Sequence, residues 1–358
     1  MTKVVYFSVR NTEYPRNARV RSYLNSRGYD VAVVPAELSG SGTHKLLSNT
    51  RRLWHARRGA EIVVLSEFSL KYAPLTWAIA RLQRAVHVVD GFVGRYESEV
   101  EDRGAISPRS VKGRALWLMD RTALRLADVY LIDTDVRAER ARKNARSRTA
   151  VITLPVGAPS WARPQALPAD LEGVQILYYG NYIPLHGIEY AVEAIAGLPG
   201  GSAVRLTLLG TESRGRALVD ALPEDVRHRF TVLAPVPENE LAEIISRHHL
   251  VLGIFGTSPK AASVLANKVW QGLAAGRTVL TRDSPALPEI STIVGSQLRT
   301  VPAGSSKDLA EQFAVLTSDL PSYPESASGL EEYVRKRFAA LVDELESRSS
   351  PSRRAATR

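Results

Sequence analysis

The stretch that decides the fold is residues 250–290, LVLGIFGTSPKAASVLANKVWQGLAAGRTVLTRDSPALPEI. It contains two short apolar runs, at 250–255 and 278–281, and between them a segment whose apolar residues recur at nearly helical spacing. Gly276 predicts the end of that helix, because glycine commonly follows a helix C-terminus. The stretch is therefore predicted to be one strand–loop–helix–strand unit. Such units build parallel sheets, which bind ligands at the carboxyl ends of their strands.

The loop at residues 256–262 follows the first of these strands and is polar. Thr257 and Lys260 lie in it, and Asn267 and Lys268 open the predicted helix. Hydroxyl groups, ammonium groups and the N–H groups of a helix N-terminus together suit a phosphate or diphosphate. We therefore expect an anionic ligand at this loop.

The rest of the chain alternates strands and helices in the same manner. The expected strands occupy residues 4–9, 29–34, 61–65, 86–89, 129–132, 151–154, 175–179, 204–209 and 230–233. Among the expected helices are segments at 46–58, 114–127, 137–148, 238–247 and 330–345. Prolines and glycines between residues 156 and 172 predict a linker. The sequence therefore predicts an α/β protein with two domains.

Length and composition limit the possible functions. The chain has 358 residues, 44% of them hydrophobic, which suits two globular domains with full cores. It has no cysteine, so disulfides and thiolate metal sites are excluded. No apolar run reaches the roughly 18 residues of a membrane span, and we expect a cytoplasmic protein that at most attaches peripherally to a membrane. Neither the dinucleotide-binding glycine motif nor the P-loop motif is present, which disfavours nicotinamide-dependent oxidoreductases and P-loop kinases.

Positive charge is concentrated in the first part of the chain. Residues 1–150 contain 27 lysines and arginines against 15 aspartates and glutamates, whereas the remainder contains 20 against 22. The first part is therefore expected to meet an anionic partner. Nucleic acid would require aromatic side chains interleaved with the basic clusters, and Trp54 alone is too little, so no nucleic-acid partner is expected.

Four segments resemble one enzyme family. Residues 267–276, NKVWQGLAAG, followed by 283–289, DSPALPE, resemble the nucleotide-sugar-binding half of GT-B-fold retaining glycosyltransferases of the group 1 or family 4 type. The resemblance extends back to 178–187, YYGNYIPLHG, and more weakly to 127–134, ADVYLIDT. Members of this family build bacterial polysaccharides, glycolipids and glycosylated natural products.

The resemblance implies two Rossmann-like domains that face each other across a cleft, with a C-terminal helix returning to the first domain. It implies an acceptor-side domain at 1–155, a linker at 156–172, a nucleotide-sugar-binding domain at 173–325, a crossing helix at 326–346 and a disordered basic tail at 347–358. The implied activity transfers a hexose from a nucleoside diphosphate sugar to an acceptor hydroxyl, with retention at the anomeric carbon. The nucleotide sugar is a co-substrate, and no cofactor is expected.

The donor site implied by the resemblance departs from the family pattern. The arginine and lysine that hold the diphosphate in the family match Asn181 and His186, and the two glutamates match Ser263 and Gln271. We expect lysines at the opposite lip of the cleft to replace the missing positive charge, and Gln271 to contact the ribose. The expected donor-binding residues are Gly180, Asn181, His186, Gly256, Thr257, Lys260, Asn267, Lys268 and Gln271.

The acceptor side is expected at the loops that follow the first-domain strands. Asp90 comes directly after the strand 86–89 and is expected to orient the acceptor, although aspartate at such a position is also common as a turn residue. The loop after the first strand contributes the acceptor-side candidates Arg10, Asn11, Tyr14 and Arg16. An anionic or lipid-linked acceptor fits the basic charge. The helix at 46–58 either contacts anionic lipid or is an ordinary helix with a solvated basic face.

Asp133 and Asp135 form a D-x-D sequence, which binds metal in glycosyltransferases of another fold. We expect no metal here, because Asp135 is positioned to cap the next helix, whose basic face at 137–148 is expected to be solvated. Two alternatives to a glycosyltransferase remain open. One is a nucleotide-sugar epimerase of the same fold, and the other is a catalytically weak binding protein that kept the fold.

Overall fold

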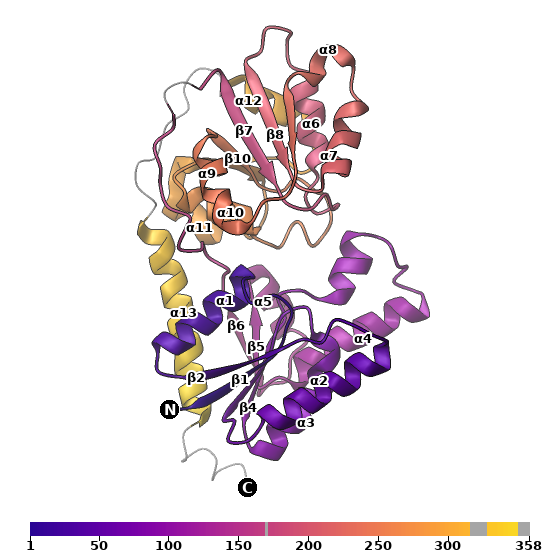
Figure 1. The fold of residues 1–358 in the computed structure, drawn as a ribbon, viewed down its shortest axis with the longest axis vertical. Coiled ribbons are helices and arrows are strands. Elements are labelled where there is room, and N and C mark those ends of the chain that lie inside the picture. The colour runs from indigo at the N-terminus through magenta and orange to yellow at the C-terminus, as the bar shows by residue number, and fades with distance from the viewer. Residues whose placement is uncertain (169–170, 316–327, 350–358) are drawn as a thin grey trace. The chain divides into compact units, whose positions relative to one another are not determined.

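The computed structural model describes residues 1–168, 171–315 and 328–349. These divide into two compact units, one formed by residues 1–156 together with the chain from Tyr333 onward, the other by residues 157–332. Each unit has one parallel sheet with helices packed on it (Figure 1). The structure thus has the predicted α/β class with two Rossmann-like domains.

The first unit contains a six-stranded parallel sheet with the strand order β2-β1-β3-β4-β5-β6. Its strands are β1 (Lys3–Val9), β2 (Asp30–Pro35), β3 (Ile62–Leu65), β4 (Val86–Asp90), β5 (Val129–Ile132) and β6 (Ala150–Thr153). Valine, isoleucine and leucine dominate them and are buried along most of their lengths, as expected for strands covered on both faces. All six strands end at the same edge, and the candidate acceptor loops leave from that edge.

Helices cover both faces of this sheet. The helices α2 (Gly42–Ala56), α3 (Ala73–Gln83) and α4 (Val111–Leu126) lie side by side on one face (Figure 1). The helices α1 (Pro15–Ser26), α5 (Asp135–Arg142) and α13 (Ser328–Ser349) lie on the other. Short helical segments at Leu70–Tyr72 and Glu97–Asp102 complete the unit.

The C-terminal helix α13 packs on the first unit from Tyr333 onward. The rings of Tyr23 and Phe338 meet edge to face at 5.1 Å, and Arg337 donates to Asp135 Oδ1 at 3.1 Å. The helix continues to Ser349, so the expectation of a disordered tail from residue 347 is wrong for its first three residues. The rest of that tail, and residues 316–327, lie outside the described chain.

The second unit contains another six-stranded parallel sheet, in the order β12-β11-β10-β7-β8-β9. Its strands are β7 (Val174–Tyr179), β8 (Val204–Leu209), β9 (Phe230–Leu233), β10 (Leu250–Leu252), β11 (Thr278–Arg282) and β12 (Leu298–Val301). The helices are α6 (Ile188–Ala196), α7 (Glu212–Asp220), α8 (Glu224–Arg227), α9 (Leu241–Ser246), α10 (Asn267–Ala274), α11 (Pro288–Val294) and α12 (Ser306–Val315). The central strand β7 thus leads directly into the loop expected to bind the donor.

Several element boundaries differ from prediction. The predicted strand 250–255 is shorter in the structure, where β10 ends at Leu252. Backbone hydrogen bonds to β11 continue at Gly253 and Ile254, and the Phe255 N–H then donates to the His186 carbonyl. The predicted helix 238–247 is a 3-10 turn followed by α9. The predicted helix 137–148 ends at Arg142. None of the described helices is both long and apolar enough to cross a bilayer.

Candidate functional site

In the second unit, two loops at the carboxyl edge of the sheet are packed backbone against backbone. The Phe255 N–H donates to the His186 carbonyl at 2.8 Å, and the Gly256 N–H donates to the Leu185 carbonyl at 3.2 Å. A Cβ atom at Gly187 would lie 2.5 Å from the Gly256 nitrogen, so only glycine allows this approach. Backbone hydrogen bonds therefore hold the loops after β7 and β10 together, and the two loops form one wall of the candidate site.

Tyr178, Asn181 and His186 form a hydrogen-bonded cluster in this wall. The Tyr178 hydroxyl donates to the Asn181 carbonyl at 2.7 Å and lies 2.8 Å from His186 Nδ1, which also contacts that carbonyl. Because a carbonyl can only accept, we assign the ring proton to Nδ1, which leaves Nε2 as an acceptor. Burial and the nearby Lys268 ammonium lower the pKa of His186 to about 2, so the ring is neutral. His186 therefore does not supply the positive charge of the lysine that it replaces.

Lys268 supplies an ammonium group next to this cluster. It stands in the first turn of α10, its side chain is buried, and its Nζ atom lies 4.1 Å from the centre of the Tyr178 ring. Within the described residues this Nζ atom has no hydrogen-bond partner. Burial lowers the pKa of Lys268 well below its usual value. A buried ammonium group without a counter-ion is costly for a folded chain unless a ligand compensates it.

The structure brings Gly180 together with these residues. A Cβ at Gly180, whose φ is +129°, would lie 3.3 Å from a ring carbon of His186 and 3.5 Å from Lys268 Nζ. A side chain here would therefore fill the space over the lysine. Of the remaining donor candidates, Thr257 is exposed, while Lys260 and Asn267 are half-buried.

Gln271 and Ser263, which match the family's two glutamates, are both buried. The Tyr179 hydroxyl donates to Gln271 Oε1 at 2.9 Å, and the Ser263 hydroxyl donates to the Lys260 carbonyl at 3.0 Å. The contact of Gln271 with a ribose stays a prediction. Its amide oxygen is already held by Tyr179, which fixes the orientation of the side chain.

In the first unit, Asp90 and Arg16 form a buried ion pair. Arg16 Nε lies 2.9 Å from Asp90 Oδ2, and Nη2 lies 3.1 Å from Oδ1, with side-chain exposures of 1% and 0%. The same guanidinium donates to the Leu154 carbonyl, and the Phe92 N–H donates to Asp90 Oδ1. These groups were expected to face the acceptor, but the structure places them in the interior. We therefore assign them a structural role, in which they tie α1 to the ends of β4 and β6.

The other acceptor-side candidates lie in the loop after β1. Arg10 and Asn11 are exposed, and the Tyr14 ring meets the ring of Phe68 edge to face at 5.3 Å. Phe68 has a φ of +63°, a conformation that side-chain-bearing residues adopt rarely and that is often found at functional sites. This strained position has no signal in the sequence.

The two aspartates of the D-x-D sequence are held by arginines. Asp133 forms an ion pair with Arg137, and Asp135 forms one with Arg337 and accepts a hydrogen bond from Thr153 at 2.5 Å. The expected capping role of Asp135 is wrong, because the Thr134 hydroxyl caps α5. The expectation of a solvated basic face is also wrong at Arg137, which is buried between Asp133 and Glu97.

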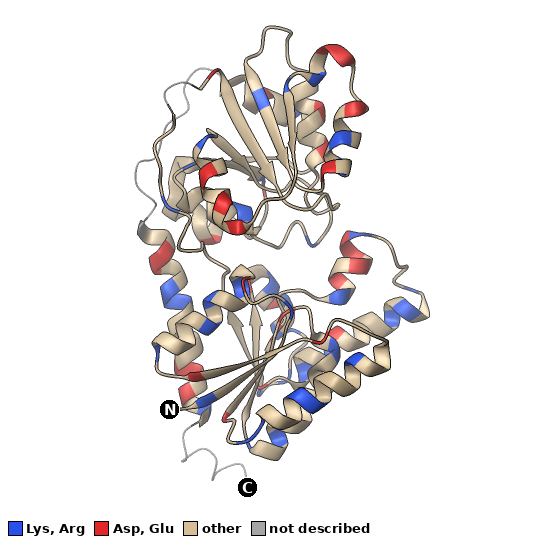
Figure 2. Cartoon of the chain, in the orientation of Figure 1, with Lys and Arg blue, Asp and Glu red and all other residues tan. Residues whose placement is uncertain are grey.

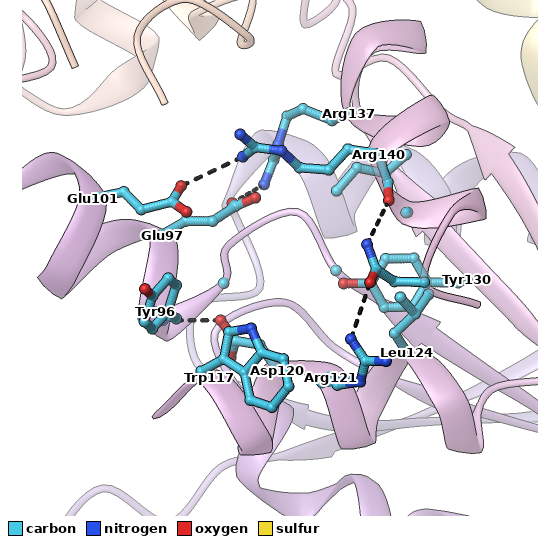
Figure 3. A pocket seen from close by; sticks show the side chains of 15 residues that line it. Tyr96, Glu97, Glu101, Trp117, Asp120, Arg121, Leu124, Tyr130, Arg137 and Arg140 are labelled. Atoms are coloured by element: carbon cyan, nitrogen blue, oxygen red, sulfur yellow. Dashed lines mark hydrogen bonds and ion pairs between the residues drawn. The ribbon is translucent and has the colours of Figure 1, made fainter. Parts of the chain in front are cut away.

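A pocket of about 390 Å³ lies in the first unit, beside Gly91 and the segment Glu97–Asp102 (Figure 3). The helical walls were missed, although their lining residues recur at the spacing i, i+3, i+4, i+7. These residues are Trp117, Asp120, Arg121 and Leu124 on α4, and Arg137, Arg140, Ala141 and Asn144 on α5 and the turn after it.

The comparisons with known proteins agree with this architecture. Residues 173–319 match the family described as glycosyl transferases group 1. No curated protein matches the chain in sequence.

Solved structures with similar folds cover nearly the whole chain. Sucrose-phosphate synthase from Thermosynechococcus elongatus has a TM-score of 0.70 at 16% identity, with 100% of both chains covered. Anabaena HepE, in complex with UDP and glucose, has a TM-score of 0.66 at 13% identity, with 97% of this chain and 99% of that chain covered. WaaG, a glycosyltransferase involved in lipopolysaccharide biosynthesis, has a TM-score of 0.64 at 14% identity, with 97% and 99% covered. The predicted GT-B fold is confirmed.

Proposed function

Because residues 173–319 match the glycosyl transferases group 1 family, we propose that this protein transfers a sugar from a nucleoside diphosphate sugar to an acceptor hydroxyl. The observation that carries the proposal is the buried ammonium group of Lys268 at the carboxyl edge of the second sheet, which has no hydrogen-bond partner among the residues that the structure describes. Anabaena HepE, a protein of similar fold, is known in complex with UDP-glucose, which agrees with a nucleotide-sugar donor.

Lys268 is proposed to bind the diphosphate. Negative charge develops on the leaving diphosphate in the transition state, and a positive group already fixed at that position stabilises it. Lys268 lies in the first turn of α10, and the N-cap residue Ala266 makes no side-chain hydrogen bond to that turn. The helix dipole and the N–H groups of the first turn therefore favour an anion at the same end. Lys260 and Asn267 are proposed to complete the site, and Gln271 to bind the ribose.

The reaction is proposed to retain the anomeric configuration and to need no metal. Retention is proposed because of the resemblance of residues 173–319 to this family, and not because of a visible nucleophile. The D-x-D aspartates are each engaged by an arginine, and within the described residues no cluster of histidine, aspartate or glutamate suits a metal ion. In the absence of a metal, Lys268 is the proposed counter-charge of the diphosphate.

The acceptor is proposed to be anionic and lipid-linked, as in polysaccharide or glycolipid assembly at the inner membrane face. The excess charge of the chain lies in residues 1–150, and Figure 2 shows lysines and arginines along α2 and α4. Helix α2 buries Asn49 and Leu53 against the sheet but leaves Leu46, Leu47 and Trp54 about half exposed or more. Exposed apolar groups beside arginines suit a surface that contacts anionic lipid.

One specific observation supports a catalytically weak binding protein as a second candidate. The Nδ1–H group of His186 already donates to the Asn181 carbonyl. Asn181 and His186, which match the arginine and lysine of the family pattern, therefore give the loop after β7 neither of those two cations. Such a protein would bind a nucleotide sugar without cleaving it. An epimerase has no comparable support, because among the described residues no cluster of acidic and histidine side chains surrounds the site.

Donor hydrolysis in the absence of acceptor distinguishes the two candidates. The protein would be incubated with UDP-, GDP-, ADP- and dTDP-hexoses, and release of nucleoside diphosphate and free sugar would be followed by NMR. A transferase should slowly hydrolyse one of these donors and release the sugar with the configuration of the donor. Binding of a donor with no turnover at any enzyme concentration would favour the binding protein instead.

A further inference from the structure

The pocket in the first unit is built by three segments whose side chains face each other. Glu97 and Glu101 project from the segment Glu97–Asp102 toward Arg137 and Arg140 on α5 (Figure 3). Trp117 lies on the opposite side, on α4. The volume of about 390 Å³ lies within the range of small-molecule sites, roughly 300–1,000 Å³. All of these residues belong to the first unit, so the pocket is complete within it.

The charges of this pocket are balanced, and two of its three arginines form ion pairs with carboxylates. Glu97 pairs with Arg137, and Glu101 accepts from Arg140 at 3.4 Å. Arg121 donates to Asn144 Oδ1 at 3.0 Å. The three arginines of the lining are matched by three carboxylates, the third being Asp120. Although residues 1–150 as a whole are strongly basic, the described lining of the pocket carries no net positive charge that would select a phosphate or another anion.

Asp120 holds the floor of the pocket in place. Its two carboxylate oxygens accept the backbone N–H groups of Arg95 and Tyr96, at 3.2 and 2.8 Å. Burial raises the pKa of Asp120 to about 6. At pH 7.5 and above the carboxylate is therefore ionised, and the loop that carries Glu97 is anchored to α4.

Trp117 gives the pocket a flat apolar surface. Its side chain is 46% exposed. The guanidinium of Arg121 lies over one face of the indole, 5.0 Å from the ring centre. An aromatic face beside fixed carboxylates and amides suits a ligand that is apolar on one side and rich in hydroxyl groups around its edge. A sugar ring has this character, since its C–H groups form a face and each hydroxyl both donates and accepts.

We propose that this pocket binds a neutral sugar ring of the acceptor, stacked on Trp117 and hydrogen-bonded by the paired carboxylates and guanidinium groups. Each pair presents an acceptor beside a donor, which matches a hydroxyl but not a phosphate. Identification of the sugar as part of the acceptor rests on the proposed function, whereas binding of a sugar by this pocket does not. An acceptor with a neutral sugar and an anionic lipid-linked portion would use both the pocket and the basic surface.

Binding of simple glycosides tests the proposal. The probes are the methyl glycosides of glucose, galactose, mannose and N-acetylglucosamine, measured at pH 8 with the full-length protein by saturation-transfer NMR and calorimetry. At least one of these glycosides should bind to the wild type. Trp117→Ala should lower the affinity for that glycoside about tenfold, as expected for loss of an aromatic contact. Trp54→Ala is the matched control, since Trp54 is 47% exposed and also carries an arginine on its ring. It should bind as the wild type does.

Several results would overturn the proposal. It fails if no glycoside binds, if Trp54→Ala and Trp117→Ala weaken binding equally, or if inorganic phosphate displaces the bound glycoside. Thermal unfolding of both variants establishes that they are folded, and Glu101→Gln, which removes a pocket carboxylate without changing its size, provides a second variant that should weaken binding.

Failure of this inference is separable from failure of the proposed function. Donor hydrolysis should be unchanged in Trp117→Ala, because the proposed donor residues belong to the other unit. Glycoside binding without any donor binding would leave the pocket assigned and the transferase rejected. Donor hydrolysis without glycoside binding would have the opposite meaning.

Discussion

The Nζ atom of Lys268 lies 4.1 Å from the centre of the Tyr178 ring and donates no hydrogen bond to any described residue. The aromatic face offers a weak attraction, but no carboxylate in the described part of the chain forms an ion pair with this group. The folded chain therefore keeps an ammonium group in a position that is unfavourable without a ligand. Such an arrangement is typical of a binding site whose ligand carries the opposite charge.

Replacement of Lys268 by methionine should stabilise the protein when no ligand is bound. The pKa of Lys268 is lower in the folded than in the unfolded chain, so wild-type folding is penalised at every pH below the unfolded value of about 10.4. The advantage of Lys268→Met should be largest at neutral pH and below, and should vanish as the pH approaches that value. Urea unfolding at several pH values measures the difference in unfolding free energy between Lys268→Met and the wild type. Destabilisation by Lys268→Met at neutral pH would show that the ammonium group has a partner in the folded state.

The His186 ring should remain neutral between pH 5 and 8, with its proton on Nδ1. Burial and Lys268 lower its pKa to about 2, and the Asn181 carbonyl selects this tautomer. Nitrogen-15 NMR of labelled histidine reports both properties directly. Titration of His186 near the ordinary value of about 6.5 would contradict the account. The urea-unfolded chain provides the reference titration.

Asp90→Ala should destabilise the protein by about 3–5 kcal/mol, because it leaves the buried Arg16 guanidinium without its counter-ion. Asp135→Ala breaks a more exposed ion pair, with Arg337, and should cost only about 0–1 kcal/mol. Urea unfolding of both variants makes the comparison. If Asp90→Ala unfolded like the wild type but lost transfer activity, the original prediction that Asp90 orients the acceptor would regain support.

Binding to vesicles should require anionic lipid. Vesicles containing phosphatidylglycerol should sediment the protein, neutral phosphatidylcholine vesicles should not, and salt should reduce recovery. Changing Arg51, Arg52, Arg57 and Arg58 to serine should weaken binding. The control changes the same number of arginines in the second unit to serine, at Arg163, Arg205, Arg216 and Arg247. Equal recovery with neutral and anionic vesicles would favour a soluble acceptor.

Most of the fold was predictable because each strand is a short run of buried aliphatic residues bounded by glycine or polar residues. The same pattern placed Lys268 at the start of a helix that follows a sheet strand, where an anion site is expected. The spacing of apolar residues along the chain was enough to predict this strand–helix–strand unit, and the structure contains it as β10, α10 and β11.

The role of Asp90 could not be predicted in this way. Its partner Arg16 is 74 residues distant in the sequence, so the pattern around either residue gives no sign of the pair. An aspartate after a strand is equally consistent with a ligand contact and with an internal ion pair, and only the packing of α1 against the sheet decides between them.

The pocket in the first unit was missed for a related reason. The spacing of Trp117, Asp120 and Arg121 on α4 is visible in the sequence, but basic helices with this spacing are usually solvated. Only the tertiary structure shows that α4 and α5 turn these faces toward the acidic segment Glu97–Asp102. The burial of Arg137 follows from that arrangement.

The central claim is that Lys268 binds the diphosphate of the donor, and calorimetry with UDP, GDP, ADP and dTDP tests it most directly. The wild type should bind at least one of them. Lys268→Met should bind that nucleotide about 10- to 100-fold more weakly, because a charge-assisted hydrogen bond is worth about 1.5–3 kcal/mol. Lys307→Met, which changes an exposed lysine of the same unit, should leave the affinity unchanged. Equal affinity of the wild type and Lys268→Met for the best diphosphate would contradict the account.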